Sequence, residues 1–98
     1  MAKYQIINVK PYRGDLSNGG GQYDNEHFLC YTDETSKYLT AGPNTDILKI
    51  RRADFDYVMR SHNYTASQLP DKVISPVFDK NGYMTDFTLS DPDTGEVI

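Results

Sequence analysis

The strongest constraint on the fold of this chain is a tight reversal in its C-terminal part. Residues 73–78 and 83–89 are rich in β-branched and aromatic side chains, and the segment between them ends in Asn81-Gly82. Asn-Gly is the residue pair best suited to the positive φ angles of a tight turn, so the pattern predicts a β-hairpin. We therefore expect antiparallel sheet in this part of the chain.

Other segments also have the composition of strands. Residues 47–52 place the apolar Leu48 and Ile50 on one face and basic residues on the other, as in a half-buried strand. Residues 13–22 include three consecutive glycines and predict a loop. Further runs of β-branched and aromatic residues predict strands at 3–12, 23–32 and 36–39.

The hydrophobic period changes after residue 52. Side chains at the i, i+3, i+4 and i+7 spacing of an amphipathic helix are Phe55, Val58, Met59 and His62. The sequence therefore predicts a short helix over 53–62, closed by Asn63.

These elements together predict a mainly β fold. Short antiparallel strands that close on themselves form small barrels, so we expect a five-stranded OB-like antiparallel barrel with one short helix. An open antiparallel sheet with the helix packed on one face is the alternative. A chain of 98 residues is long enough for one such domain, which we expect at residues 1–89, followed by a flexible acidic C-terminal tail at residues 90–98.

The charge balance constrains the partners of this domain. Ten Lys and Arg against fourteen Asp and Glu give a net charge of −4, which argues against a uniformly basic coat for nucleic acid. Three of the acids, Asp91, Asp93 and Glu96, fall in the tail, which holds no base. The body is thus close to neutral and is compatible with a local basic groove. The tail either competes for that groove, recruits a protein partner or only aids solubility.

The single cysteine, Cys30, excludes an internal disulfide and a thiolate-cage zinc site. The first residues contain no apolar segment typical of a signal peptide, and no apolar run approaches the length of a membrane span. We therefore expect a cytoplasmic protein with no metal, no cofactor and no membrane partner.

The signals for an enzyme are poor. His27 and Cys30 have an odd separation in an expected strand, so their side chains point to opposite faces and do not form a couple. Asp24 and Glu26 share a strand face, where a solvated pair is favoured over an acid–base pair. The sequence predicts no enzyme and no catalytic residue.

The aromatic residues carry the clearest functional signal. The chain has eight tyrosines and no tryptophan, and Tyr23 and Tyr31 share one face of an expected strand. Proteins that bind single-stranded nucleic acid stack bases on strand-borne aromatic rings, while Lys and Arg follow the phosphates. Basic residues suited to that role are Arg13, Lys49, Arg51 and Arg52. The alternative is that the tyrosines only cover a thin core with their hydroxyl groups outward.

The second expected strand also carries a family resemblance. Tyr23, the run Leu29-Cys30-Tyr31 and Asp33 match, in register, the helix-destabilising proteins of filamentous phages, a family of single-stranded DNA-binding proteins that this segment resembles. A looser similarity extends to Arg13, Asn25-Glu26, Gly82, Met84 and Asp86.

The resemblance implies a five-stranded OB-type fold, a symmetric dimer and cooperative binding to single strands with little sequence preference. By position it implies that Tyr23 stacks on a base, that Arg13 contacts phosphate and that Tyr31 lies closer to the core. The expected helix at 53–62 and the acidic tail depart from the family pattern.

Two hypotheses of function follow. The first is a homodimeric, non-sequence-specific single-stranded DNA-binding protein of phage or plasmid replication, located in the host cytoplasm if phage-encoded. Its expected interface residues are Arg13, Tyr23, Tyr31, Lys49, Arg51 and Arg52. The second is a small phage- or plasmid-encoded interaction protein, such as an inhibitor of a host protein, that does not bind DNA.

Overall fold

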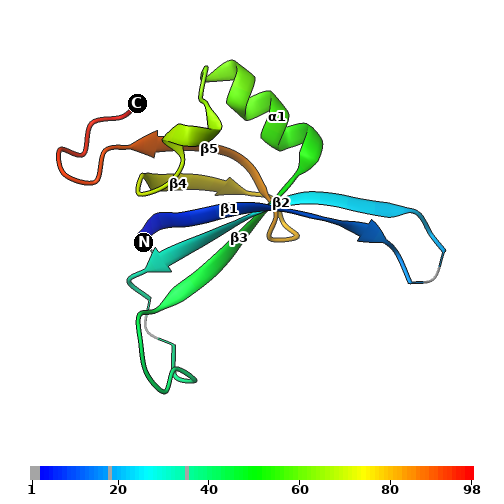
Figure 1. The fold of residues 1–98 in the computed structure, drawn as a ribbon, viewed down its shortest axis with the longest axis horizontal. Helices are drawn as coiled ribbons and strands as arrows, with labels where there is room; N and C mark the ends of the chain where they lie inside the picture. Colours follow the sequence, from blue (N-terminus) through cyan, green and yellow to red (C-terminus); the bar gives the residue numbers. More distant parts are fainter. Residues whose placement is uncertain (1–2, 18, 35) are drawn as a thin grey trace.

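A computed structural model, which describes residues 3–17, 19–34 and 36–98, has a closed barrel of five strands and one α-helix (Figure 1). The elements are β1 (Tyr4–Asp15), β2 (Gln22–Thr32), β3 (Thr45–Arg51), α1 (Arg52–Ser61), a 3-10 turn η1 (Ala66–Gln68), β4 (Val73–Phe78) and β5 (Met84–Ser90). The prediction of a mainly β, OB-like barrel is confirmed, and the open-sheet alternative is wrong. Residues 1–2 of the expected domain and Asn18 of the expected loop lie outside the described residues.

The barrel closes in the order β1-β2-β3-β5-β4. β1 pairs with β2, β2 with β3 and β4 with β5, each antiparallel, whereas β3 meets β5 in parallel at Ile50 and Met84. β1 completes the ring by pairing with β4 at Tyr4 and Ile74. The closing contacts are short, one residue pair between β3 and β5 and two between β1 and β4, so the ring is closed only locally.

Alternation of side chains builds the core. Leu48 and Ile50 of β3 point inward and are buried, as the sequence pattern predicts, and Phe28 and Cys30 of β2 do the same. The rings of Phe28 and Phe87 meet edge-on, with their centroids 5.3 Å apart. The complete buried apolar cluster is Ile6, Phe28, Cys30, Leu48, Ile50, Val58, Tyr64, Leu69, Ile74, Met84, Phe87 and Leu89.

Helix α1 is confirmed, with its bounds shifted by one residue from the prediction. It lies on one side of the barrel and buries Val58 against it (Figure 1). Asn63 ends the helix as expected, with a φ of 57°. The N–H of Asn63 donates to the carbonyl of Arg60 and that of Tyr64 to Met59, which is the Schellman arrangement of a helix terminus.

The β4–β5 hairpin is also confirmed, but its turn differs in detail. Of the pair Asn81-Gly82, only Gly82 has a positive φ, 83°. The carboxylate of Asp79 accepts the N–H groups of Asn81 (2.9 Å) and Tyr83 (3.0 Å), so this side chain fixes the turn. A turn closed by a single left-handed glycine is the longer hairpin type.

Two predictions about the N-terminal half are wrong. Residues 36–39 form turns and no strand, because they find no pairing partner in the barrel. The expected loop at 13–22 is shorter, since Arg13, Gly14 and Asp15 continue β1 and pair with β2. The resulting two-stranded ribbon reaches away from the barrel (Figure 1).

The C-terminal segment turns back on β5. Asp91 accepts the N–H groups of Asp93 and Thr94, and Val97 forms a bridge with Ser90. The hydroxyl of Tyr64 donates to the carbonyl of Ile98 at 3.1 Å. The flexibility expected for residues 90–98 stays a prediction. Within the described part of the chain, no helix is long and apolar enough to cross a membrane.

Candidate nucleic-acid interface

Three neighbouring strands, β1, β2 and β3, present one side of the sheet to solvent, which we call the outer face. Its side chains belong to alternate positions of each strand, and the strand register aligns them in rows. The rows are Gly14–Tyr23, Tyr12–Asn25–Arg51, Lys10–His27–Lys49, Asn8–Leu29–Ile47 and Gln5–Tyr31–Thr45.

A stack of three rings begins at one end of the outer face and spans its first three rows. The ring of Tyr12 lies 4.5 Å from His27, with 12° between the planes, and 5.2 Å from Tyr23, with 25° between them. Tyr12, which stacks on both of the other rings, remains 52% exposed. Partial burial, and then the neighbouring Tyr12, raise the pKa of Tyr23 above its ordinary value.

The outer face carries positive charge although the chain is acidic. Its rows contain the cations Lys10, Lys49 and Arg51 and no carboxylate. Lys10 and Lys49 lie directly on either side of His27. The charges of the chain are therefore segregated, and the net charge of −4 does not describe this surface.

The β4–β5 turn contributes a further aromatic ring beside these cations. The guanidinium of Arg51 lies 4.0 Å from the ring centroid of Tyr83, and the Lys49 ammonium lies 5.2 Å from it. Arg51 also forms an ion pair with Asp79 at 3.0 Å. That ion pair, more than any other contact, lowers the pKa of Asp79. The turn is thus held against β3 through Arg51.

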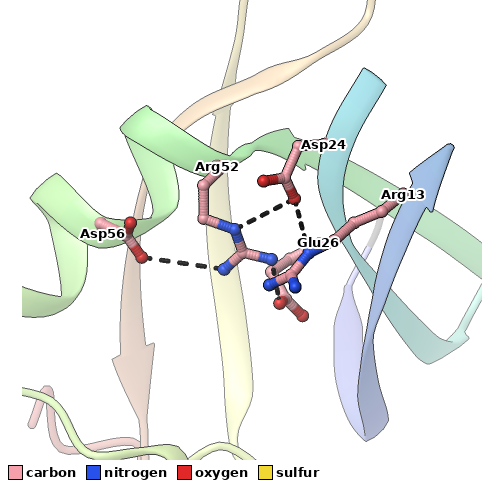
Figure 2. A network of polar contacts seen from close by, with 5 residues as sticks. All are labelled: Arg13, Asp24, Glu26, Arg52 and Asp56. Atoms are coloured by element: carbon pink, nitrogen blue, oxygen red, sulfur yellow. Dashed lines mark hydrogen bonds and ion pairs between the residues drawn. The ribbon is translucent and has the colours of Figure 1, made fainter. Parts of the chain in front are cut away.

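A second charged cluster lies on the opposite side of the β1–β2 ribbon, next to α1. Figure 2 shows Arg13, Asp24, Glu26, Arg52 and Asp56 in one network. Asp24 accepts from Arg13 at 2.9 Å and from Arg52 at 3.3 Å, and the buried Glu26 accepts from Arg52. This hydrogen bond to Glu26 is the main reason why the pKa of Arg52 is raised. The network ties the ribbon to the first turn of the helix.

The structure thus divides the six residues predicted for the interface. Tyr23, Tyr31, Lys49 and Arg51 lie together on the outer face, and Tyr31 is 46% exposed. Arg13 and Arg52 lie in the opposite cluster, where carboxylates neutralise them.

The sequence did not predict the roles of Lys10, Tyr12 and His27 on the outer face, nor of Tyr83 in the β4–β5 turn beside it. Lys10 and Tyr12 come from β1, and only the pairing with β2 brings them beside Tyr23. Tyr83 directly follows the predicted turn, so the sequence places it at the end of the hairpin. It does not predict that this end lies beside β3.

His27 has an unusual environment in this stack. Its Nε2 atom is screened from solvent and has no hydrogen-bond partner among the described residues. Burial, followed by the charge of Lys49, lowers the pKa of His27, while Glu26 acts weakly in the other direction. The imidazole is therefore neutral at pH 7.

Cys30 points to the opposite side from His27, as predicted, and is fully buried. Burial raises the pKa of its thiol to about 12, so it is inert as a nucleophile at neutral pH. Across the described ranges of the chain, no group of His, Cys, Asp or Glu side chains is arranged to hold a metal ion.

No protein-family model, no curated protein and no solved structure matches this chain. The resemblance to the helix-destabilising proteins of filamentous phages thus stays a prediction.

Proposed function

We propose that this protein binds single-stranded DNA with little sequence preference through its outer face. The observation that carries the proposal is the stack of the exposed Tyr12 with the half-buried Tyr23 and His27, on a surface with three cations and no carboxylate in its rows. In OB folds, strands 2 and 3 with the adjoining loops are the customary site for oligonucleotides, and the outer face lies on these strands.

The chemistry of the proposed contact is simple. Bases stack on the half-buried ring of Tyr23, at the end of the stack, and on the exposed ring of Tyr31, at about 1–3 kcal/mol for each stacked base. Lys10 and Lys49 neutralise phosphates along the same path, and the counterions released provide the salt-dependent part of the affinity. The rows of the outer face hold no carboxylate, although Asp79 of the β4–β5 turn pairs with Arg51 at their edge.

Arg13 and Arg52 do not belong to the proposed interface, because each already contacts a carboxylate on the side of the β1–β2 ribbon opposite the outer face. Their predicted role as phosphate contacts stays a prediction. The homodimer, the replication role and the phage or plasmid origin rest on the family resemblance and stay predictions.

Titration of intrinsic tyrosine fluorescence tests the proposal. Oligo(dT) should quench the fluorescence, duplex DNA should not, and the affinity should fall with salt at a slope of about −0.7 per phosphate contacted. Lys49→Ala should make that slope shallower by about 0.7. The matched control, Lys37→Ala in an exposed loop, should leave it unchanged. Absence of binding to oligo(dT) even at low salt would refute the proposal.

A second candidate function is a protein-interaction module. The fourth row of the outer face is largely apolar, because Leu29 and Ile47 lie side by side and Ile47 is 50% exposed. A flat apolar surface of this kind suits a protein partner as well as a base. Retained fluorescence with every DNA probe, at all salt concentrations, would favour this second function.

A further inference from the structure

The turn between β4 and β5 contains a reactive pair of residues. Asn81 and Gly82 are both exposed at this turn. A Cβ atom at Gly82 would meet no heavy atom within 4 Å apart from its chain neighbours, so the space around this residue is open to water. Because glycine has no side chain, its backbone nitrogen is the least shielded that can follow an asparagine. The side-chain amide of Asn81 is therefore open to attack by the nitrogen of Gly82.

We propose that Asn81 is a site of spontaneous deamidation. The Gly82 nitrogen loses its proton to hydroxide and attacks the side-chain carbonyl carbon of Asn81. A bond forms between these two atoms, and the bond from that carbon to the amide nitrogen breaks. The leaving nitrogen takes a proton from water and departs as ammonia, which regenerates the hydroxide. The cyclic imide then adds one water molecule at either carbonyl carbon and opens to aspartate or isoaspartate. Nothing is oxidised or reduced, and water is the only co-reactant.

The geometry of the turn controls the rate of this reaction. The N–H of Gly82 donates to the carbonyl of Asp79 at 3.1 Å, and this hydrogen bond must open before the nitrogen can lose its proton. The carboxylate of Asp79 also holds the N–H groups of Asn81 and Tyr83. The intact turn therefore slows the reaction, and removal of the Asp79 side chain should accelerate it.

Other asparagines provide internal comparisons. Asn63 is as exposed as Asn81 in class, but Tyr64 follows it, and the N–H of Tyr64 donates to the carbonyl of Met59 at 2.9 Å. Every other described asparagine is also followed by a residue that has a side chain. The sequence contains a second Asn-Gly pair, Asn18-Gly19, of which Asn18 lies outside the described residues. This pair must be measured separately.

Deamidation places a new carboxylate beside the outer face. The N–H of Asn81 is bonded to the carboxylate of Asp79, which in turn pairs with Arg51 at 3.0 Å. The new charge therefore lies within about one Debye length, about 10 Å, of Arg51. This consequence rests on the proposed function. The modified protein should bind oligo(dT) about two- to fivefold more weakly at low salt.

Peptide mass spectrometry after incubation at mildly alkaline pH tests the modification itself. Asn81 should convert to aspartate and isoaspartate over days, faster than Asn63 in the same sample, and faster still in Asp79→Ala. Conversion at Asn81 that is no faster than at Asn63 would refute the site. An unchanged rate in Asp79→Ala would mean that the turn does not control the reaction.

Binding of oligo(dT) before and after the same incubation tests the consequence. An Asn18→Gln background removes the second Asn-Gly pair. In this background the incubated protein should lose affinity, whereas the matched Asn81→Gln variant, incubated equally, should keep it. If fresh protein does not bind, the proposed function is wrong, and the mass spectrometry still decides on the modification. If Asn81 converts but the affinity is unchanged, the modification stands and its effect on the outer face is wrong.

Discussion

The ring of Tyr23 lies directly over Gly14, its partner across the β1–β2 ribbon. A Cβ atom at Gly14 would stand 2.4 Å from the Tyr23 hydroxyl oxygen and 2.6 Å from the ring carbon that bears it, closer than real Cβ contacts. Any other residue at this position would force the Tyr23 ring to shift. The absence of a side chain at Gly14 lets Tyr23 lie flat next to Tyr12, and so positions the end of the stack.

Gly14→Ala should lower the affinity for oligo(dT) by about fivefold or more, because the methyl group displaces the Tyr23 ring and costs up to one stacked base. Fluorescence titration measures the change. A double-mutant cycle provides the control: in a Tyr23→Ala background the same substitution should have no further effect on affinity. An equal loss in both backgrounds would mean that Gly14 acts through the backbone.

Arg52→Ala should destabilise the fold by about 2–4 kcal/mol in urea unfolding, because it leaves the buried carboxylate of Glu26 without its cation. Arg13→Ala is the matched control, since Arg13 contacts Asp24 on the exposed side of the same network. Its loss should cost less than about 1 kcal/mol. Arg13→Ala should also leave the salt dependence of DNA binding unchanged. If the affinity of the Arg13→Ala variant depended less steeply on salt than that of the wild type, Arg13 would be a phosphate contact.

How far the sequence predicts this fold depends on the range of the interactions. The β4–β5 hairpin and the end of α1 are set by neighbours along the chain, Asn81-Gly82 and Asn63, and both could be predicted. The alternation of Leu48 and Ile50 is equally local. Residues 36–39 resemble a strand in composition, but a strand also needs a partner, which composition does not reveal.

The candidate site depends on pairing between strands, and there the sequence is less informative. From the sequence, Arg13 belongs to a glycine-rich loop. In the structure β1 continues past it, and its pairing with Asp24 places its side chain on the face opposite Tyr23. Conversely, Tyr12 reaches the stack only through the register of β1 with β2. The strand register gathers the cations on one face, and the net charge of the chain does not reveal this.

The lowered pKa of His27 makes stability depend on pH. The unfolded chain protonates this group at a higher pH than the folded protein, so the unfolded state binds more protons between the lowered pKa and the ordinary value of about 6.5. The free energy of unfolding should therefore fall as the pH decreases through about 6.5. Urea unfolding at a series of pH values between about 5 and 8 measures it.

Two variants identify His27 as the source of that dependence. His27→Gln should remove this contribution to the slope of stability against pH. Lys49→Met should reduce it, because the charge of Lys49 is the second cause of the lowered pKa after burial. A slope that is unchanged in His27→Gln would assign the dependence to other groups.

Arg51 is a cation of the proposed interface, and its charge is neutralised by an ion pair with Asp79. Asp79→Asn removes the competing charge but keeps an oxygen that can accept the N–H groups of Asn81 and Tyr83, so the turn should persist. With Arg51 free to meet a phosphate, the affinity for oligo(dT) at low salt should rise by about two- to fivefold. Asp93→Asn in the C-terminal segment changes the net charge equally and isolates the local effect. If the affinity rises only in Asp79→Asn, Arg51 contacts the strand. If it rises equally in both variants, the net charge controls the affinity and Arg51 makes no specific contact.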